Sequence, residues 1–370
     1  MANEGSIKFE ELPSEVLVKI LSFLEIVDFI KCSKTCKRIR VIFYDNSLWK
    51  RINLSKKRVP SEFLRKMIDD YGCKCLNLNE AKVIGTLRLK YESQLKILDL
   101  SGCSAENQSV FEELLRSCSH LQKLSFTQKL KLEVMSQLTA LNGKTLQILN
   151  CWQGNQGRSG WNPDWLELST IKCIIKNCPE LKELTFWSGD NESDGENRSK
   201  SNENLFYYCR IFRNNIDYLV NNIPPKIETF DFGYSAFGEE QIKILVTRCT
   251  KLKELRLLVY TSDTNDSVTH IINYLKPTLE KLVIDYGIGY GENNHQKLYK
   301  LKSMPKLKNL DFSYNTTDIN VISELRKQLP YVSVNGYPSL ISEEPVQVAQ
   351  PPRRGRSRRT QNTYQLKSHL

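Results

Sequence analysis

The phrase CTKLKELRL, from Cys249 to Leu257, occurs in two further versions, CSHLQKLSF from Cys118 and CPELKELTF from Cys178. All three share the spacing Cys-x-x-Leu-x-x-Leu-x-Leu/Phe. The apolar part of this frame recurs without the leading Cys, starting at Leu95, Leu146, Ile227, Leu279 and Leu307. The steps between the eight frame starts are 26, 25, 35, 46, 25, 27 and 28 residues. A repeat of this length is typical of solenoid proteins.

The frame predicts one strand and one helix per repeat. Its final Leu-x-Leu alternates with period two, so the apolar members face one side of a strand. Segments such as EEQIKILVTRC, from Glu239, then follow with helical spacing. Because one such unit cannot bury its apolar face alone, stacked units would share a continuous core. We therefore predict an α/β fold, a leucine-rich-repeat solenoid with a curved parallel sheet and outer helices. The frame with its Cys resembles the cysteine-containing leucine-rich repeats, and this resemblance implies that Cys118, Cys178 and Cys249 are buried at helix ends.

The N-terminal stretch FEELPSEVLVKILSFL, from Phe9 to Leu24, is more apolar than a surface helix requires. Its apolar residues spread over about 180° of a helix, whereas a surface helix needs a stripe of roughly 100°. A second helix is predicted from about Asp28, with one apolar stripe that continues to Phe43. A third short segment, NSLWKRINL, carries Trp49. The extra apolar arc of the first helix predicts burial on two sides.

Residues 9–54 resemble an F-box in the order and spacing of their motif residues. These are Leu12-Pro13, Glu15, Leu17, Ile20, Leu21 and Leu24, then Cys36-Lys37-Arg38, then Leu48-Trp49. One departure is Ile39, where the family often has Trp. An F-box followed by cysteine-type repeats is similar to the F-box/leucine-rich-repeat family, and within it to the S-phase-kinase-associated branch.

The resemblance implies a non-enzymatic substrate receptor of a Skp–cullin–F-box ubiquitin ligase. Its partners would be a Skp-type adaptor, through it a cullin scaffold, and a protein substrate. The residues expected to contact the adaptor are Leu12, Pro13, Val16, Ile20, Leu21, Leu24 and Trp49. The alternative for each of them is a place in the domain's own core.

The concave face of the sheet is the predicted substrate site. Trp152 and Trp187 fall at the same place in adjacent frames, beside the two longest repeats. Exposed aromatic residues are common anchors of binding sites, although these rings could instead fill gaps left by irregular repeats. The predicted substrate-binding residues are Trp152, Trp187, Asn150, Thr185, Asp231 and Arg256.

The chain shows no motif for catalysis or for a cofactor. It has no glycine-rich phosphate loop, nucleophile elbow or metalloprotease helix, and DYGIGYGEN from Asp285 lacks the GxGxxG spacing. Cys73-x-Cys75 has no second pair, and the four His are scattered, so we predict no metal. No apolar run reaches the length of about 18 residues that suggests a membrane span, and no signal peptide is evident, so the eleven cysteines are expected to be reduced.

The formal charge of +11 is uneven, because residues 341–370 carry six Lys and Arg against two Glu. This tail contains RRGRSRR, a candidate nuclear-import signal formed by Arg353, Arg354, Arg356, Arg358 and Arg359, and we expect the protein in nucleus and cytoplasm. The expected division is a flexible segment 1–8, the F-box 9–54, linker helices 55–72, the repeat array 73–338 with insertions near 153–166 and 188–203, and a disordered basic tail 339–370. Two alternatives remain, a repeat scaffold without a role in ubiquitination and a nucleic-acid-associated adaptor that uses the tail.

Overall fold

The structure is a computed structural model, and it describes residues 9–127, 131–153, 168–188, 213–259, 266–286, 295–312 and 319–335. The chain divides into two compact units, unit 1 from Met1 to Ser193 and unit 2 from Asp194 to Leu370. The predicted tail, including RRGRSRR, and most of the two predicted insertions lie outside the described residues. In the part that is described, no helix is long and apolar enough to cross a membrane.

Unit 1 begins with short helices: a 3-10 turn Phe9–Glu11, α1 (Ser14–Leu21), α2 (Ile26–Cys32), α3 (Lys37–Phe43) and α4 (Asn46–Trp49). The predicted single helix from Asp28 to Phe43 is wrong, because the chain breaks between α2 and α3. The hydroxyl of Thr35 donates to the carbonyl of Cys32 just after α2 ends, and Cys36 Sγ accepts the N–H of Ile39 at 3.4 Å, which caps α3. The apolar stripe survives the break because both helices pack on the same core.

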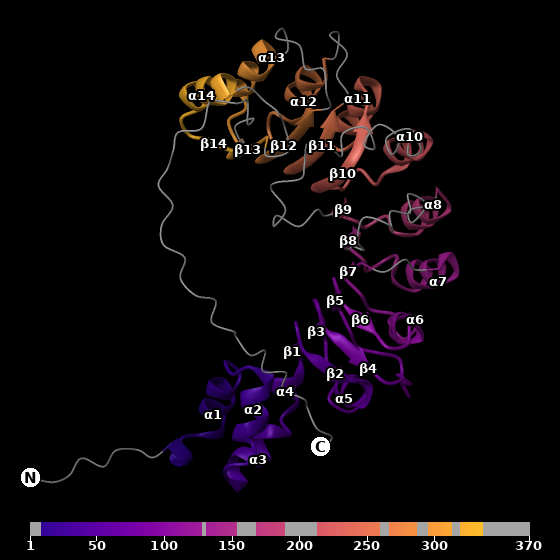
Figure 1. Cartoon of the computed structure of the whole chain (residues 1–370), viewed down its shortest axis with the longest axis vertical. Coiled ribbons are helices and arrows are strands. Elements are labelled where there is room, and N and C mark those ends of the chain that lie inside the picture. Colours follow the sequence, from indigo (N-terminus) through magenta and orange to yellow (C-terminus); the bar gives the residue numbers. More distant parts are fainter. Residues whose placement is uncertain are drawn as a thin grey trace, which may run out of the picture. The chain divides into compact units, whose positions relative to one another are not determined.

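Parallel strands of unit 1 follow these helices in chain order: β1 (Arg51–Asn53), β3 (Cys75–Asn77), β5 (Ile97–Leu100), β7 (Lys123–Phe126), β8 (Ile148–Gln153) and β9 (Glu183–Ser188). A second parallel sheet contains β2 (Arg58–Pro60), β4 (Lys82–Ile84) and β6 (Ser104–Ala105). The helices are α5 (Ser61–Arg65), a π-helical turn (Lys66–Asp70), α6 (Ser109–Arg116), α7 (Leu132–Asn142) and α8 (Leu168–Asn177). Helices α6, α7 and α8 lie on the outer side of their strands (Figure 1).

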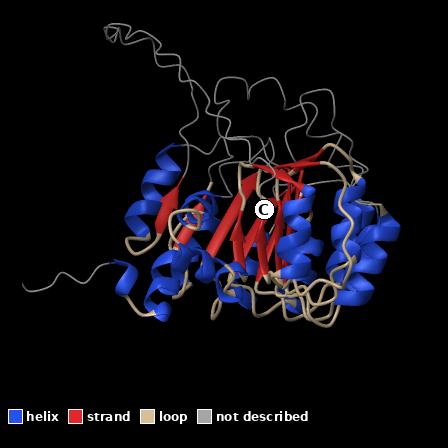
Figure 2. Ribbon diagram, turned by 90° about the horizontal axis from the view of Figure 1, so that it is seen from below, coloured by secondary structure: helices blue, strands red, loops and turns tan. Residues whose placement is uncertain are grey.

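Unit 2 repeats the same arrangement with five parallel strands: β10 (Thr229–Phe237), β11 (Glu254–Val259), β12 (Lys281–Tyr286), β13 (Asn309–Asp311) and β14 (Ser333–Asn335). Figure 2 shows strands side by side with helices packed around them. Its described helices are α10 (Arg213–Asn222), α11 (Glu239–Arg248), α12 (Ser267–Leu275), α13 (His295–Tyr299), a 3-10 turn (Lys300–Ser303) and α14 (Ile319–Gln328).

The predicted apolar frame forms the core of both units. Strand pairing aligns the second apolar residue of each frame into one column, Leu98, Leu124, Leu149 and Leu184 in unit 1 and Leu255, Leu282 and Leu310 in unit 2. All seven of these side chains are at most 1% exposed. The prediction of a strand–helix solenoid with a parallel sheet is therefore confirmed.

The repeat array begins earlier than residue 73. Strand β1, inside the range predicted as F-box, pairs with β3, and residues 55–72, predicted as linker helices, contain β2, α5 and the π-helical turn. These segments form the first repeat rather than a linker. Its frame is short, because only Ile52 and Leu54 mark it in the sequence.

The cysteines of the frame are buried, as predicted. Cys118, Cys178 and Cys249 are each 0% exposed, and Cys118 Sγ lies 3.2 Å from the carbonyl oxygen of Leu114. Burial raises the pKa of the Cys118 thiol to about 11 and that of Cys249 to about 12. In the frame at Leu146 the cysteine is replaced by Gly143, where an added Cβ would lie 1.9 Å from the carbonyl oxygen of Asn177.

We expect the Cys249 thiol to make the fold sensitive to alkali. In the unfolded chain the pKa of this thiol is about 8.5, and in the folded chain it is about 12. The free energy of unfolding is therefore unaffected by this thiol below about pH 8.5 and falls as the pH rises towards 12. At about pH 10 the loss should be on the order of 1–2 kcal/mol for this thiol. Urea unfolding at about pH 8 and pH 10 should therefore show a smaller alkaline loss in Cys249→Ala than in the natural chain. An equal loss in both proteins would contradict the assignment.

Candidate functional site

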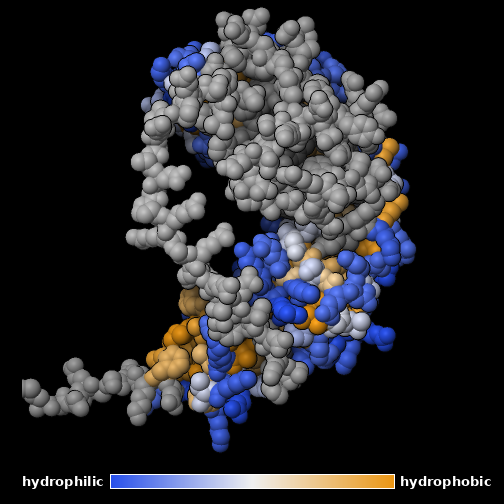
Figure 3. Space-filling view, viewed as in Figure 1, coloured by the Kyte–Doolittle hydropathy of each residue, from blue (hydrophilic) through white to orange (hydrophobic). Residues whose placement is uncertain are grey.

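Helix α1 and the turn that follows it, which holds Phe23 and Leu24, present two apolar stripes on different sides. The inner stripe, Leu17 and Leu21, is 0% and 3% exposed and packs into the domain. The outer stripe consists of Val16, Ile20, Phe23 and Leu24, which are 42%, 38%, 77% and 39% exposed. Figure 3 shows hydrophobic surface over the helices of this region. The wide apolar arc of the sequence is therefore only half used by the domain's own core.

The surroundings of the outer stripe keep α1 in place. Pro13 precedes the helix and its carbonyl accepts the first helical hydrogen bonds, from the N–H groups of Val16 and Leu17. The guanidinium of Arg38, from α3, donates to the carbonyl oxygen of Leu12 at 2.5 Å. The Lys19 ammonium lies 5.2 Å from the ring centre of Phe23, at the edge of the stripe. The outer stripe is thus an apolar surface on an anchored helix.

Two residues predicted as adaptor contacts are corrected by their burial. Leu21 belongs to the inner stripe, and Trp49 is 0% exposed. The Trp49 ring lies 4.8 Å from Phe43 and 5.4 Å from Phe29, and its Nε1–H donates to the carbonyl of Phe43 at 2.6 Å. Both side chains are core residues, because no partner can reach them without opening the domain.

The rest of the predicted adaptor set is accessible. Pro13, Val16, Ile20 and Leu24 are exposed, and Leu12 is half-buried. The prediction omitted Phe23, the most exposed member of the outer stripe. Its spacing of seven residues from Val16 is the signal that could have included it.

Ring stacking, an ion pair and backbone hydrogen bonds join the N-terminal helices to the first repeat. The rings of Trp49 and Tyr71 stack with centroids 4.8 Å apart and planes 24° apart. Lys57 Nζ lies 3.0 Å from Glu25 Oε2, and the N–H groups of Lys74 and Cys75 both donate to the carbonyl of Lys50. The core of the helical domain therefore continues into the sheet.

The predicted substrate residues of unit 1 lie on neighbouring strands. Trp152 pairs with Trp187 and Asn150 with Thr185 in the register of β8 and β9. The Thr185 hydroxyl donates to Asn150 Oδ1 at 2.9 Å, and Asn150 Nδ2 donates to Ser125 Oγ at 3.5 Å. Ser125, Asn150 and Thr185 thus form a row of hydrogen-bonded neutral side chains. The two tryptophans lie two residues further along β8 and β9 than Asn150 and Thr185.

Asp231 and Arg256, the other two predicted residues, belong to unit 2. They are register partners on β10 and β11, and their charged groups approach to 3.6 Å. Both side chains are largely covered, at 24% and 13% exposure. The six predicted substrate residues therefore divide into one group in each unit.

The comparisons with known proteins match this architecture. A family model described as F-box-like matches residues 9–55. Those residues form an F-box-like domain, and a leucine-rich-repeat array follows it.

Two solved structures are similar to the chain at low identity. One is a chain of the Rad7 and Elc1 complex in yeast, at 14% identity, with 88% of this chain and 83% of that chain covered and a TM-score of 0.48. The other is a leucine-rich-repeat protein of Leptospira interrogans, at 14% identity, with 75% and 74% covered and a TM-score of 0.30.

Proposed function

We propose that this protein is the non-catalytic substrate receptor of a Skp–cullin–F-box ubiquitin ligase. The observation that carries the proposal is the outer stripe of α1, an exposed apolar surface on a domain that the F-box-like model matches. Apolar side chains in such a patch gain free energy when a partner covers them. A Skp-type adaptor is the partner that an F-box implies.

The repeat array would hold the substrate. The polar row of Ser125, Asn150 and Thr185, with the strand positions of Trp152 and Trp187 beside it, supports a binding surface on the sheet of unit 1. The receptor then acts by proximity, since it would hold the substrate beside a ubiquitin-loaded enzyme that the cullin carries. No side chain of the receptor would take part in the chemistry.

Reconstitution with purified components tests this proposal. The full chain should form a stable complex with a Skp-type adaptor, and the pair should then recruit a cullin. Removal of the cullin from cells should raise the abundance of proteins that co-purify with the chain. If the adaptor binds but the abundance of those proteins does not change, the protein is a scaffold without a role in ubiquitination. If the adaptor does not bind, the receptor role is wrong.

A further inference from the structure

One backbone position recurs just before β1, β3, β5, β7, β8 and β9 in unit 1 and just before β10, β11, β12 and β13 in unit 2, and we call this set the start column. In unit 1 it comprises Lys50, Lys74, Lys96, Gln122, Gln147 and Lys182, and in unit 2 Glu228, Lys253, Glu280 and Lys308. Within each unit, the N–H of each member donates to the carbonyl of the member before it, at 2.7 to 2.9 Å. The two units therefore offer the same geometry with different side chains.

The start column of unit 2 alternates in charge and pairs internally. Lys253 Nζ lies 2.6 Å from Glu228 Oε2, and Lys308 Nζ lies 2.5 Å from Glu280 Oε2. One position further along, Lys281 and Glu254 approach to 3.5 Å. The cations of this column are therefore neutralised by their neighbours on adjacent strands.

The start column of unit 1 carries only positive charge. Lys50, Lys74 and Lys96 come from three consecutive repeats, and all three side chains are exposed. Arg51, exposed, and Lys123, half-buried, occupy the next position on β1 and β7. We call these five residues the basic ladder.

Among the described residues, no carboxylate lies within 4.0 Å of a cationic group of the ladder. The pKa of Asp45 is lowered mainly by hydrogen bonds from Ser47 and slightly by the charge of Lys50. Adjacent strands lie about 4.8 Å apart, and like charges on neighbouring strands destabilise a sheet. Repulsion between the cations of the ladder therefore lowers the stability of unit 1, whereas the ion pairs of the start column avoid this cost in unit 2.

We propose that the basic ladder binds an acidic segment of the substrate protein, a run of Asp and Glu side chains. The inference deepens the proposed function, on which it rests for the identity of the ligand. The ladder spans three strand spacings, about 14 Å, which about four extended residues cover. Four of its five cations are lysines, whose ammonium groups act as point charges and pair with the carboxylates of Asp and Glu without requiring a fixed fork geometry.

Fluorescence anisotropy with the full-length chain and a labelled peptide of about eight residues, mostly Glu, tests the proposal. We expect this peptide to bind at low salt and its Gln counterpart to bind at least about tenfold more weakly. Binding should weaken as salt shortens the Debye length below about 8 Å. The variant Lys74→Glu/Lys96→Glu should lose at least about tenfold in affinity. The affinity of a milder variant, Lys74→Gln/Lys96→Gln, should lie between those of the natural chain and the Glu variant. This second variant keeps the test valid if the Glu variant misfolds.

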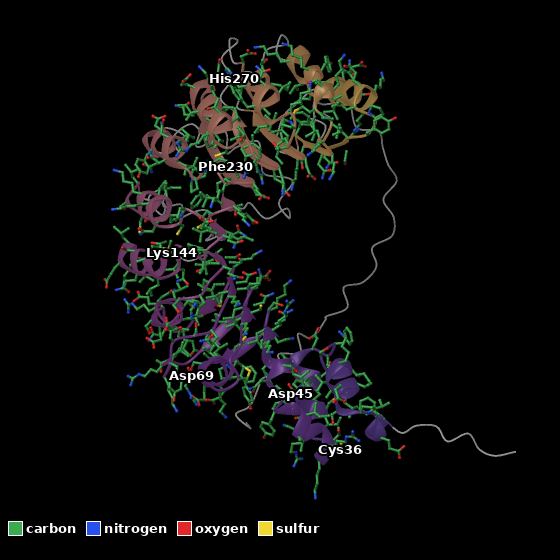
Figure 4. All side chains as sticks on the ribbon, turned by 180° about the vertical axis from the view of Figure 1, so that it is seen from behind. Cys36, Asp45, Asp69, Lys144, Phe230 and His270 are labelled. Atoms are coloured by element: carbon green, nitrogen blue, oxygen red, sulfur yellow. The ribbon has the colours of Figure 1, made fainter. Side chains whose placement is uncertain are left out.

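The control is Lys144→Glu/Lys176→Glu, which changes the net charge equally. Both lysines are exposed, and neither belongs to the ladder: Lys144 follows α7 (Figure 4), and Lys176 lies in the last turn of α8. The control should stay within about twofold of the natural chain. An equal loss in control and ladder variants, or no loss in either, overturns the proposal.

Two further probes, a phosphoserine peptide and a single-stranded oligonucleotide, distinguish an acidic peptide from other anionic ligands. A phosphoserine peptide that binds while the Glu peptide does not would overturn the assignment to carboxylates. A single-stranded oligonucleotide of equal charge that displaces the Glu peptide more strongly than unlabelled peptide would make the ladder a nucleic-acid site. Since α1 is unchanged in the ladder variants, they should still bind the adaptor. If the natural chain binds the Glu peptide but does not bind the adaptor, only the receptor role is overturned.

Discussion

Replacing Val16 and Ile20 by aspartate should weaken binding of a Skp-type adaptor by at least about 100-fold. The two side chains form the centre of the outer stripe, and neither is needed by the core. Covering the exposed part of each side chain stabilises a complex by roughly 1 kcal/mol, and burying an unpaired carboxylate in its place adds a further penalty of about 1–3 kcal/mol or more. A loss of about 2.8 kcal/mol already corresponds to 100-fold. Isothermal titration with the purified adaptor measures the effect.

The matched control for this double variant is Leu132→Asp/Leu141→Asp on α7. These leucines are 42% and 52% exposed, so the chemical change is the same, but they lie in the repeat array. Adaptor affinity should stay within about twofold of the natural chain in this control. If Val16→Asp/Ile20→Asp keeps full affinity and an unchanged circular dichroism spectrum, the outer stripe is not the adaptor surface.

Replacing Trp49 by alanine should produce a large loss of stability, on the order of 3–5 kcal/mol. The ring is fully buried, and it contacts Phe43 on one side and Tyr71, in the first repeat, on the other. Its removal leaves a cavity and deprives the carbonyl of Phe43 of a hydrogen bond. Hydrogen exchange should therefore show that the F-box helices and strands β1 and β3 lose protection together.

Tyr44→Ala serves as the control, because Tyr44 also touches Phe43 but is 59% exposed. Its cost should stay below about 1 kcal/mol, as for most surface substitutions. The sequence prediction of Trp49 as an adaptor contact has the opposite signature. It requires Trp49→Ala to weaken adaptor binding while the urea midpoint stays unchanged.

The apolar frame was predictable because its period of two within a strand and its spacing between strands repeat eight times. The first repeat was not, since Ile52 and Leu54 alone are too short a pattern to distinguish from chance. Another feature without a sequence signal is Asn142, whose amide donates to the carbonyls of Cys118 and Leu138 and accepts the N–H of Leu121. A buried asparagine of this kind is visible only once the helix and the loop are placed.

On α1 the sequence predicted two-sided burial but not the side on which each residue lies. Val16 and Leu17 differ by only about 100° around the helix, so the position of α3 decides which stripe is inner. Trp49 sits in a helix of four residues, too short for any periodicity. The basic ladder was equally hidden, because its lysines are 24, 22 and 27 residues apart and come together only through the strand register.

If the protein is a substrate receptor, the junction at Trp49 would fix the distance between its two binding surfaces. Strand β1 starts two residues after the buried indole, so no long linker separates the N-terminal helices from the first strands of unit 1. A substrate held on those strands could not swing freely toward the transferring enzyme. The acceptor lysine would then be selected by its distance along the substrate from the bound segment. Each repeat inserted between junction and binding point would move that choice by about 4.8 Å, so the array would act as a molecular ruler.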